Sequence, residues 1–325
     1  MKIILVGMTA EDRLSDTASD GKAVADEVCA NCGKAAVDNI KLKICTACKL
    51  VKYCSVDCQK NHRPQHKRAC KKRAAEIRDQ QLFAQPDGSN LGECPICCLP
   101  LPLDEKKFSL NSCCCKHTCD GCDYANKTRE IEQGLEQRCP FCREPMPKTQ
   151  EEVDKNYMKR VKVNDPVALC ELGNKCDEEN DHEGAFEHWT KSSKLGDAEA
   201  HYNLSVMYAK GQGVEKDEKR EVYHLEEAAI GGHHKARYNL GIVEEENGRF
   251  DRAMKHYIIA ANLGDDGALE AVKKGFAHGI VRKEDFEAAL RGHQTAVDAA
   301  KSQQRSAAEG ALQSGFLGGF YRNNI

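Results

Sequence analysis

Residues 29–70 read CANCGKAAVDNIKLKICTACKLVKYCSVDCQKNHRPQHKRAC, and the spacing of the cysteines decides how this part of the chain folds. A Cys-x2-Cys pair on a tight turn directs two thiolates at one ion. An x3 pair on a helix does the same, because residues i and i+4 lie on one face. Zinc takes four such ligands in a tetrahedron. Two closed, structural zinc sites are therefore predicted from eight ligands: Cys29, Cys32, Cys45, Cys48, Cys54, Cys58, His66 and Cys70.

This spacing closely resembles that of the MYND zinc finger, at every ligand position. The resemblance implies that the pairs alternate along the chain, with one zinc bound by Cys29, Cys32, Cys54 and Cys58 and the other by Cys45, Cys48, His66 and Cys70. It also implies a peptide-docking module, and we take Tyr53 and the basic helix after it as the docking surface. His62, one turn before His66, is interpreted as an exposed or supporting histidine.

A second cysteine-rich stretch spans residues 93–148. Three Cys-x2-Cys pairs surround a central group of cysteines, an order that resembles the RING finger. The resemblance implies a cross-brace, in which the first and third pairs bind one zinc and the second and fourth bind another. The predicted ligands are Cys94, Cys97, Cys119 and Cys122 at the first site, and Cys113, Cys115, Cys139 and Cys142 at the second.

The central group departs from the common RING pattern. His117 precedes Cys119 by only two positions, which leaves little room for a histidine ligand. Cysteine in the histidine place fits the spacing better. Two ligands of the second site must come from this central group. We predict Cys113 and Cys115, and the alternatives are Cys114 and His117. Cys98 is surplus and is predicted to be a free thiol.

Three further residues extend the resemblance to active RING ubiquitin ligases. Ile96 lies between the first two ligands, Pro140 follows the seventh, and Arg143 follows the eighth. In that family the apolar residue and the proline contact the ubiquitin-conjugating enzyme. The arginine holds ubiquitin through the fixed hydrogen bonds of its planar guanidinium. Such a ligase acts by positioning a thioester, so we predict no catalytic nucleophile. The alternative is a protein-docking zinc module without activity.

From residue 166 the sequence repeats at helical spacing. Units begin around Ala168, Ala200, Ala236 and Ala268, and "AEAHYNLSVMYAKGQGV" is typical of one of them. Each unit predicts a helix–turn–helix that buries its apolar face only by stacking on its neighbours. The pattern resembles the Sel-one-like repeat, a relative of the tetratricopeptide repeat. This resemblance implies a concave groove that holds a protein or peptide, and the alternative is a rigid spacer that positions the zinc modules.

The sequence therefore predicts a multidomain protein, with two small zinc-stabilised fingers followed by an all-α helical-repeat solenoid. The fingers and repeats are separated by segments of different composition, including a Pro/Gly/Ser-rich stretch. The predicted order is a disordered tail at 1–26, a MYND finger at 27–75, a linker at 76–92, a RING-like finger at 93–148, a connecting helix at 149–165, the repeats at 166–300 and a tail at 301–325.

Composition and charge narrow the class of protein. Seventeen of the 19 cysteines lie between Cys29 and Cys142. Apolar runs fall short of the ~18 residues of a membrane helix, and no signal peptide is evident. We expect an intracellular protein, cytoplasmic or nuclear, with metal-bound rather than disulfide-bonded cysteines. Residues 41–80 have a formal charge of +9 and residues 166–299 of −9. Because no aromatic residues alternate with the basic ones, we do not expect nucleic-acid binding.

These features predict a zinc-binding RING-type ubiquitin ligase, or a component of one, with two zinc ions in each finger. Its partners would be a ubiquitin-conjugating enzyme and a substrate protein recruited by the repeats and the MYND finger. The alternative is a non-enzymatic scaffold, in which the fingers and the repeats bind other proteins.

Overall fold

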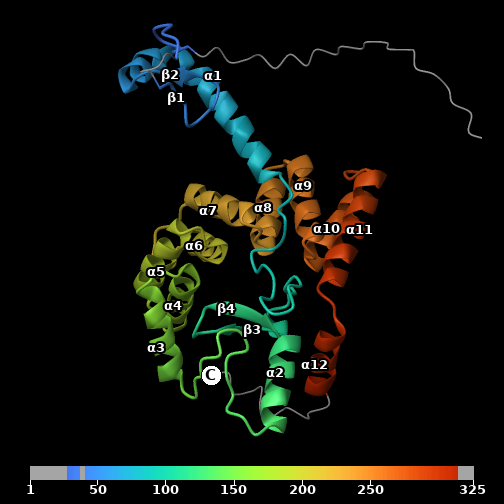
Figure 1. Ribbon diagram of the computed structural model, residues 1–325. Coiled ribbons are helices and arrows are strands. Elements are labelled where there is room, and N and C mark those ends of the chain that lie inside the picture. The colour runs from blue at the N-terminus through green and yellow to red at the C-terminus, as the bar shows by residue number, and fades with distance from the viewer. Residues whose placement is uncertain (1–27, 37–40, 314–325) are drawn as a thin grey trace, which may run out of the picture. The chain divides into compact units, whose positions relative to one another are not determined.

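The structure, a computed structural model, describes residues 28–36 and 41–313 (Figure 1). Contacts divide the chain into two compact units, Met1–Asp79 and Gln80–Ile325. The predicted tail at 1–26 lies outside the described residues. In the ranges that the structure does describe, no helix combines the length and the apolar character needed to cross a membrane.

The first unit consists of a small sheet and most of one long helix. Strand β1 (Lys43–Ile44) pairs antiparallel with β2 (Lys52–Tyr53), and helix α1 (Val56–Leu82) follows. The buried core is mostly thiol and consists of Cys29, Cys45, Cys48 and Tyr53. So small an apolar core does not stabilise a fold of this size. The fold of this unit therefore depends on its cysteines.

Helix α1 runs further than the sequence predicts. Residues 76–92 are expected to be a linker, whereas the helix continues to Leu82. Residues 74–82 read AAEIRDQQL, which is compatible with a helix throughout, and the first helix-breaking residue after it is Pro86. Irregular structure begins at Phe83, shortly before the Pro/Gly-rich stretch.

The second unit begins with the end of α1 and an irregular segment, and the second cysteine-rich module, residues 93–148, follows. It contains the short helix η1 (Glu105–Lys107), strands β3 (Phe108–Asn111) and β4 (Lys116–Cys119), and helix α2 (Asp120–Glu132). The strands pair antiparallel, with Phe108 opposite Cys119 and Asn111 opposite Lys116. The turn between them carries the cysteine triplet.

An all-helical region follows. Its helices are α3 (Gln150–Val161), α4 (Pro166–Glu178), α5 (His182–Lys194), α6 (Ala198–Lys210), α7 (Glu218–Ile230), α8 (His234–Glu246), α9 (Phe250–Asn262), α10 (Asp266–Ala277), α11 (Lys283–Ala299) and α12 (Gln303–Gln313). Helix α12 lies within the tail predicted at 301–325, and residues 314–325 are outside the described residues.

The repeat pattern has a local cause at each unit. The first helix of every unit starts from a capping side chain that accepts a backbone N–H three residues further on. That N–H belongs to the recurring alanine, which is 0% exposed in all four units. The capping residue and its alanine are Asp165 and Ala168, Asp197 and Ala200, His233 and Ala236, and Asp265 and Ala268.

Glycines lie where the paired helices cross. A Cβ added to Gly173 would stand 2.5 Å from the Trp189 ring, and one added to Gly241 would stand 2.3 Å from the Tyr257 ring. The two pairs are related by the same 68-residue shift along the sequence. These crossings are therefore so close that no side chain fits.

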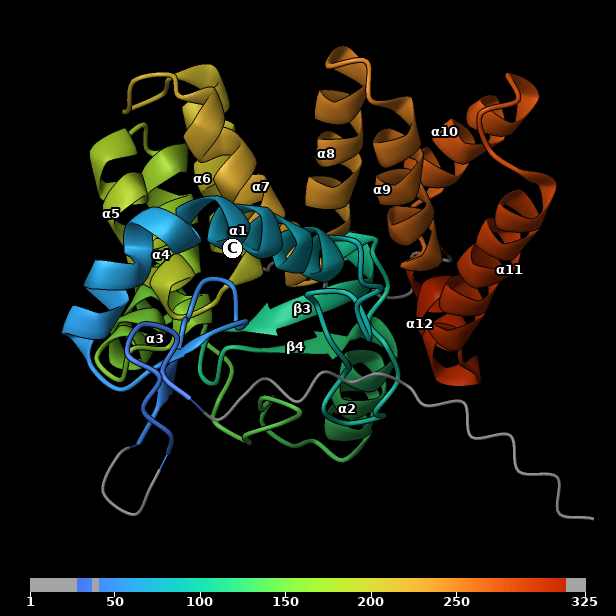
Figure 2. The ribbon, with the colours of Figure 1, turned by 90° about the horizontal axis from the view of Figure 1, so that it is seen from above.

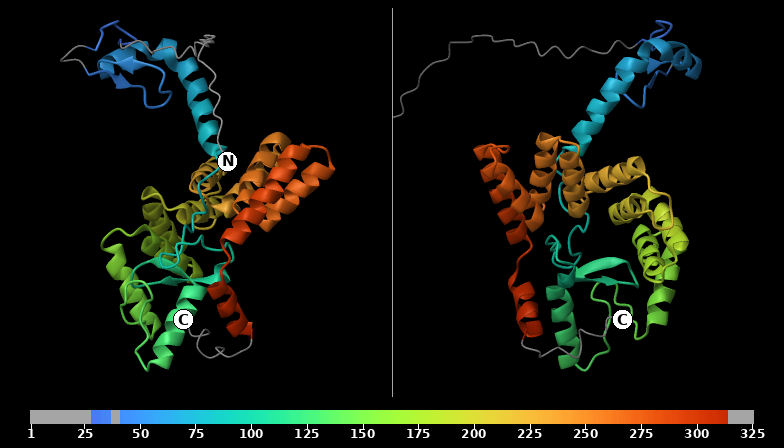
Figure 3. Two further views of the ribbon diagram at one scale, coloured as in Figure 1. Left: turned by 45° about the vertical axis from the view of Figure 1, so that its right-hand side comes forward. Right: turned by 180° about the vertical axis from the view of Figure 1, so that it is seen from behind.

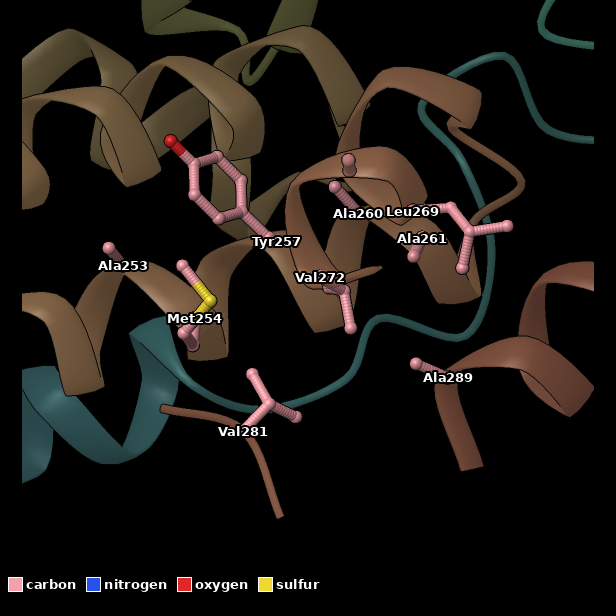
Figure 4. Packing of buried hydrophobic residues seen from close by; sticks show 10 residues of the cluster. Ala253, Met254, Tyr257, Ala260, Ala261, Leu269, Val272, Val281 and Ala289 are labelled. Carbon is pink, nitrogen blue, oxygen red and sulfur yellow. The ribbon is translucent and has the colours of Figure 1, made fainter. Parts of the chain in front are cut away.

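The C-terminal units share one core. Figure 4 shows Met254 of α9, Val272 of α10 and Ala289 of α11 together with their neighbours in this cluster. Val281, in the turn between α10 and α11, is 6% exposed and belongs to the same core. Burial of these side chains joins the last helices to the array.

Helices α3 to α12 follow one another in an arc, and β3, β4 and α2 lie within it (Figures 1, 2 and 3). Polar contacts join the module to the arc at widely separated points: Lys235 Nζ to Glu105 Oε1 at 2.6 Å, Asn156 Nδ2 to Ser112 Oγ at 3.4 Å, and Lys107 Nζ to Glu309 Oε1 at 3.5 Å. The inner face of the helical array thus faces the chain's own second module.

Candidate metal centres

The first group of ligand atoms comes from three parts of the first unit. Cys29 and Cys32 lie on a tight turn closed by the bond from Gly33 N–H to the Cys29 carbonyl at 2.9 Å. Cys54 follows β2, and Cys58 lies in the first turn of α1. The Sγ atom of Cys54 is 3.5 Å from that of Cys32 and 3.5 Å from that of Cys58.

The second group in this unit joins a turn to the middle of α1. Cys45 and Cys48 lie on a turn after β1, and His66 and Cys70 occupy positions i and i+4 of the helix. The sulfur of Cys48 is 3.2 Å from His66 Nε2, and the sulfurs of Cys45 and Cys70 are 3.8 Å apart. The structure thus brings together all eight predicted residues as the two alternating groups.

The second module contains a third group, made of Cys94, Cys97, Cys119 and Cys122. Cys119 ends β4 and Cys122 lies in the first turn of α2, so a strand–helix junction faces the first Cys-x2-Cys turn. The Cys97 and Cys119 sulfurs are 3.8 Å apart. The hydrogen bond from the Cys119 thiol lowers the pKa of Cys94 to about 4.

The fourth group differs from the prediction at one position. It consists of Cys113, Cys114, Cys139 and Cys142, with Cys114 where Cys115 was expected. The Cys113–Cys142 and Cys114–Cys139 sulfur distances are 3.3 and 3.9 Å.

The β3–β4 turn explains this difference. The N–H groups of Cys114 and Cys115 both donate to the Asn111 carbonyl, and Cys115 has a φ of 53°. This left-handed residue turns its side chain away from the group, and the buried Cys115 sulfur lies 4.0 Å from the Ser112 carbonyl oxygen. Burial raises the pKa of Cys115 to about 12, which keeps it a neutral thiol.

His117, Cys98 and His62 also lie outside the four groups. The ring of His117 meets that of Phe108 edge-on, with centroids 5.2 Å apart, and burial lowers its pKa. Cys98 is exposed. In the first unit, a 3.0 Å hydrogen bond joins His62 Nδ1 to the Tyr53 hydroxyl. Tyr53 is only 3% exposed, so this residue of the predicted docking surface is not accessible to a peptide.

The four groups fit zinc. Within each group, all ligand atoms lie within 4.8 Å of one another. A tetrahedron with Zn–S bonds of about 2.3 Å has sulfurs about 3.8 Å apart, close to the separations observed here. Each group supplies four ligands and leaves no open position, which is the arrangement of structural zinc. The MYND finger binds zinc, and the groups of the second module are consistent with further ions.

Helix α12 contributes to the surroundings of the third group, which the sequence did not reveal. Arg305 Nη2 lies 3.6 Å from the Cys97 sulfur, and Arg305 Nη1 donates to the Pro100 carbonyl at 2.7 Å. Gln304 Oε1 lies 3.9 Å from the Cys122 sulfur. A guanidinium N–H beside a cysteine sulfur, as Arg305 places beside Cys97, orients the ligand and stabilises its thiolate charge. No local pattern marks residues 304 and 305, because their partners precede them by about 200 positions.

The three residues predicted to contact a conjugating enzyme are differently placed. Ile96 is 42% exposed, whereas Pro140 is buried. The Arg143 guanidinium donates to Asn126 Oδ1 at 2.6 Å and lies 3.7 Å from Glu130 Oε1. The cation is therefore engaged within the module.

Comparison with known families identifies two of the three modules. Residues 29–70 match the MYND finger, and residues 167–197, 198–233 and 234–265 match the Sel1 repeat. Residues 94–142 match no RING family. MYND fingers and Sel1 repeats mediate protein–protein interactions. The chain is thus a MYND zinc finger, a second cysteine-rich module and an all-helical Sel1 repeat region.

Two solved structures are each similar to 60% of this chain. A Sel1 repeat protein from Oxalobacter formigenes has 24% identity and a TM-score of 0.41, covering 60% of this chain and 77% of that one. A protective antigen of uropathogenic Escherichia coli with an SLR fold has 20% identity and a TM-score of 0.38, covering 60% of this chain and 40% of that one. No curated protein matches the sequence.

Proposed function

We propose that this chain is a non-enzymatic adaptor that binds other proteins through its MYND finger and the exposed faces of its Sel1 repeats. The observation that carries the proposal is that each metal group supplies four protein ligands, so none offers a position for a substrate. Zinc in these groups has a structural role, and the exposed surfaces remain for binding. Because thiolate ligands require reducing conditions, we expect the adaptor to act inside the cell, in the cytoplasm or nucleus.

The MYND finger offers a surface with defined chemistry. Ile44 and Leu50, which flank the Cys45–Cys48 turn, are each 47% exposed, and Val56 at the start of α1 is 59% exposed. Helix α1 carries eight basic and three acidic residues. Apolar side chains beside a basic helix suit a peptide that combines apolar and acidic residues.

A peptide-library selection on the purified, zinc-loaded chain tests this function. The expected result is enrichment of apolar and acidic peptides whose binding is lost in the Ile44→Asp/Leu50→Asp variant, because two new carboxylates repel acidic residues. Leu135→Asp is the matched control, since Leu135 is 53% exposed and belongs to the second module. Equal binding by all three proteins, with unchanged zinc content, would reject the MYND surface as the docking site.

A second candidate function is that of a RING-type ubiquitin ligase. It is favoured by the cross-brace order of the third and fourth groups and by the exposure of Ile96. The burial of Pro140 and the internal hydrogen bond of Arg143 count against it. In this function the module would bind a conjugating enzyme and would do no covalent chemistry itself.

Ubiquitin transfer distinguishes the two candidates. The zinc-loaded chain would be incubated with ubiquitin, activating enzyme and a broad panel of conjugating enzymes. Zinc-dependent chain formation that falls at least tenfold with Ile96→Ala or Arg143→Ala would establish the ligase. Absence of activity across the panel, in protein that retains its zinc, would reject the ligase function and favour the adaptor function.

A further inference from the structure

Residues 82–90, here termed the anchor segment, connect α1 to the second module and lie against the repeats. Their first residue, Leu82, is 1% exposed. A segment that only joined two modules would leave such a side chain in solvent. Leu82 instead belongs to a core with residues of α7 and α8, namely Leu225, Ala228, Ala229, Ala236 and Leu240.

Arg237 of α8 holds the main chain of the anchor segment. Its side chain is 0% exposed, and its guanidinium donates to the Leu82 carbonyl and, at 3.4 Å, to the Ala84 carbonyl. No carboxylate in the described part of the chain pairs with Arg237, and burial lowers its pKa to about 10. A buried cation is costly unless its hydrogen bonds are satisfied. The carbonyls at and just after the end of α1, where the helix dipole is negative, compensate its two terminal nitrogens, whereas Nε has no partner among the described residues.

Phe83 occupies a cationic recess of α9. Its ring centroid is 4.8 Å from that of His256, and the guanidinium carbon of Arg252 lies 4.7 Å from the ring. The ammonium of Lys255 lies 5.4 Å from the same ring. Cations over an aromatic face are attracted by its negative π surface, so this recess selects an aromatic side chain.

The rest of the anchor segment follows the repeat surface closely. Asn262 Nδ2 donates to Gln85 Oε1 at 3.1 Å, and the Asn90 N–H donates to the Gly232 carbonyl at 3.2 Å. A Cβ added to Gly232 would stand 2.5 Å from the Gly88 carbonyl oxygen. The glycine that closes this repeat therefore also allows the segment to approach.

We propose that α7, α8 and α9 form a peptide-binding site whose occupant is the chain's own anchor segment. The site binds a peptide in which a helix ends at a leucine, an aromatic residue follows, and the chain then continues without helical structure. Leucine fills the apolar recess, Arg237 binds the backbone, and Arg252 and His256 select the ring. External proteins reach this site only by displacing the anchor segment. The inference holds whether or not the adaptor function does, because it concerns an intramolecular ligand.

Limited proteolysis of the full chain tests the role of Arg237. Chymotrypsin cleaves after Phe83 only when the anchor segment leaves the site. We expect Arg237→Met to increase this cleavage rate at least tenfold over the unaltered chain. The matched control is Arg220→Met, because Arg220 lies on α7 and contacts Tyr208 and Asp217 rather than the anchor segment. Equal cleavage rates in the unaltered and Arg237→Met chains would overturn the proposal.

A labelled peptide of residues 80–92 tests the site itself. The Leu82→Ser/Phe83→Ser chain should bind this peptide with a Kd at least tenfold lower than the unaltered chain, whose tethered segment competes at high effective concentration. Adding Arg237→Met, or using a peptide with serine at both positions, should abolish the difference. Failure of the serine variant to bind better, with its helical circular dichroism intact, contradicts the proposal. Should that variant lose its helices, the chymotrypsin rates decide.

Discussion

The MYND finger and the second cysteine-rich module use the same ligand chemistry in different surroundings. Apart from Tyr53, the buried core of the MYND finger consists of its own cysteines. The second module has a similarly small core, with Leu101 beside three cysteines. It also receives hydrogen bonds from neighbouring helices, including those of Arg305 in α12 to the Leu99 and Pro100 carbonyls at 3.3 and 2.7 Å. We therefore expect the MYND finger to depend on its metal for stability, whereas the second module is stabilised by metal and by neighbouring helices.

Metal removal should produce the largest difference. A structural zinc contributes on the order of 10 kcal/mol to a small finger, so we expect a chelator to unfold residues 28–75 completely. Residues 94–142 should keep partial protection, and α4–α11 should keep theirs. Hydrogen exchange measured by mass spectrometry checks all three regions. Loss of protection in α4–α11 in parallel with the MYND finger would contradict independent stabilisation, and protection should return when zinc is added back.

The fourth ligand group provides the next test. We expect four zinc ions per chain, with Cys114→Ser lowering the content by one because a site with three ligands binds more weakly. Cys115→Ser should leave the content unchanged, since its sulfur faces the Ser112 carbonyl. Elemental analysis of dialysed protein measures both. Loss of one zinc ion in Cys115→Ser, with the content of Cys114→Ser unchanged, would support the pair Cys113 and Cys115 that the spacing favours.

A side chain added where two repeat helices cross should have a smaller effect, and it should reach the second module but not the MYND finger. Gly241→Ala forces a Cβ into the Tyr257 ring and should cost about 1–3 kcal/mol of unfolding free energy. Protection of the second module should fall with that of the repeats, while the MYND finger should be unaffected.

Gly310→Ala is the matched control for this crowding, because a Cβ there meets open space within α12. It should stabilise the chain by about 0.5–1 kcal/mol through helix propensity. Urea unfolding of both variants measures the difference. A similar loss of stability in both would show that steric crowding is not the cause.

The smallest expected effect concerns one contact between the repeats and the second module. Lys235 and Glu105 form a 2.6 Å ion pair with side chains 45% and 69% exposed. Exposed pairs contribute at most about 1 kcal/mol, so Lys235→Ala should change the unfolding free energy by no more than that. A double-mutant cycle with Glu105→Ala isolates the pair. A coupling several times larger would contradict this, and would mean that the ion pair is a main stabilising contact between the module and the repeats.

Local spacing was sufficient to predict most of the architecture. Pairs separated by two or three residues have their geometry set by a turn or a helix, so the paired ligands followed from local spacing. The way in which pairs combine into the groups around Cys29, Cys45 and Cys94 followed from the resemblance to MYND and RING fingers. The helix pairs followed from recurrent alanines because each repeat imposes the same packing arrangement.

Contacts between segments that are distant in the sequence could not be predicted from local spacing. Cys114 replaces Cys115 because the register of β3 and β4 sets the turn, and adjacent cysteines look alike in a spacing pattern. Arg237 resembles any helical arginine in "HHKARYNLG", since its partner Leu82 is 155 positions away. The composition of residues 84–92 suggests a solvated linker, and nothing in it reports the cationic recess that Phe83 enters.

The distance between Leu82 and Arg237 along the chain has a consequence for biosynthesis. At roughly 5–20 residues per second, a ribosome needs about 8–30 s to add the 155 positions that separate them. During that interval Leu82 and Phe83 have emerged without their binding site, and the second module has no neighbouring helices. The nascent chain therefore passes through a stage in which zinc capture precedes docking, and two apolar side chains are available to chaperones.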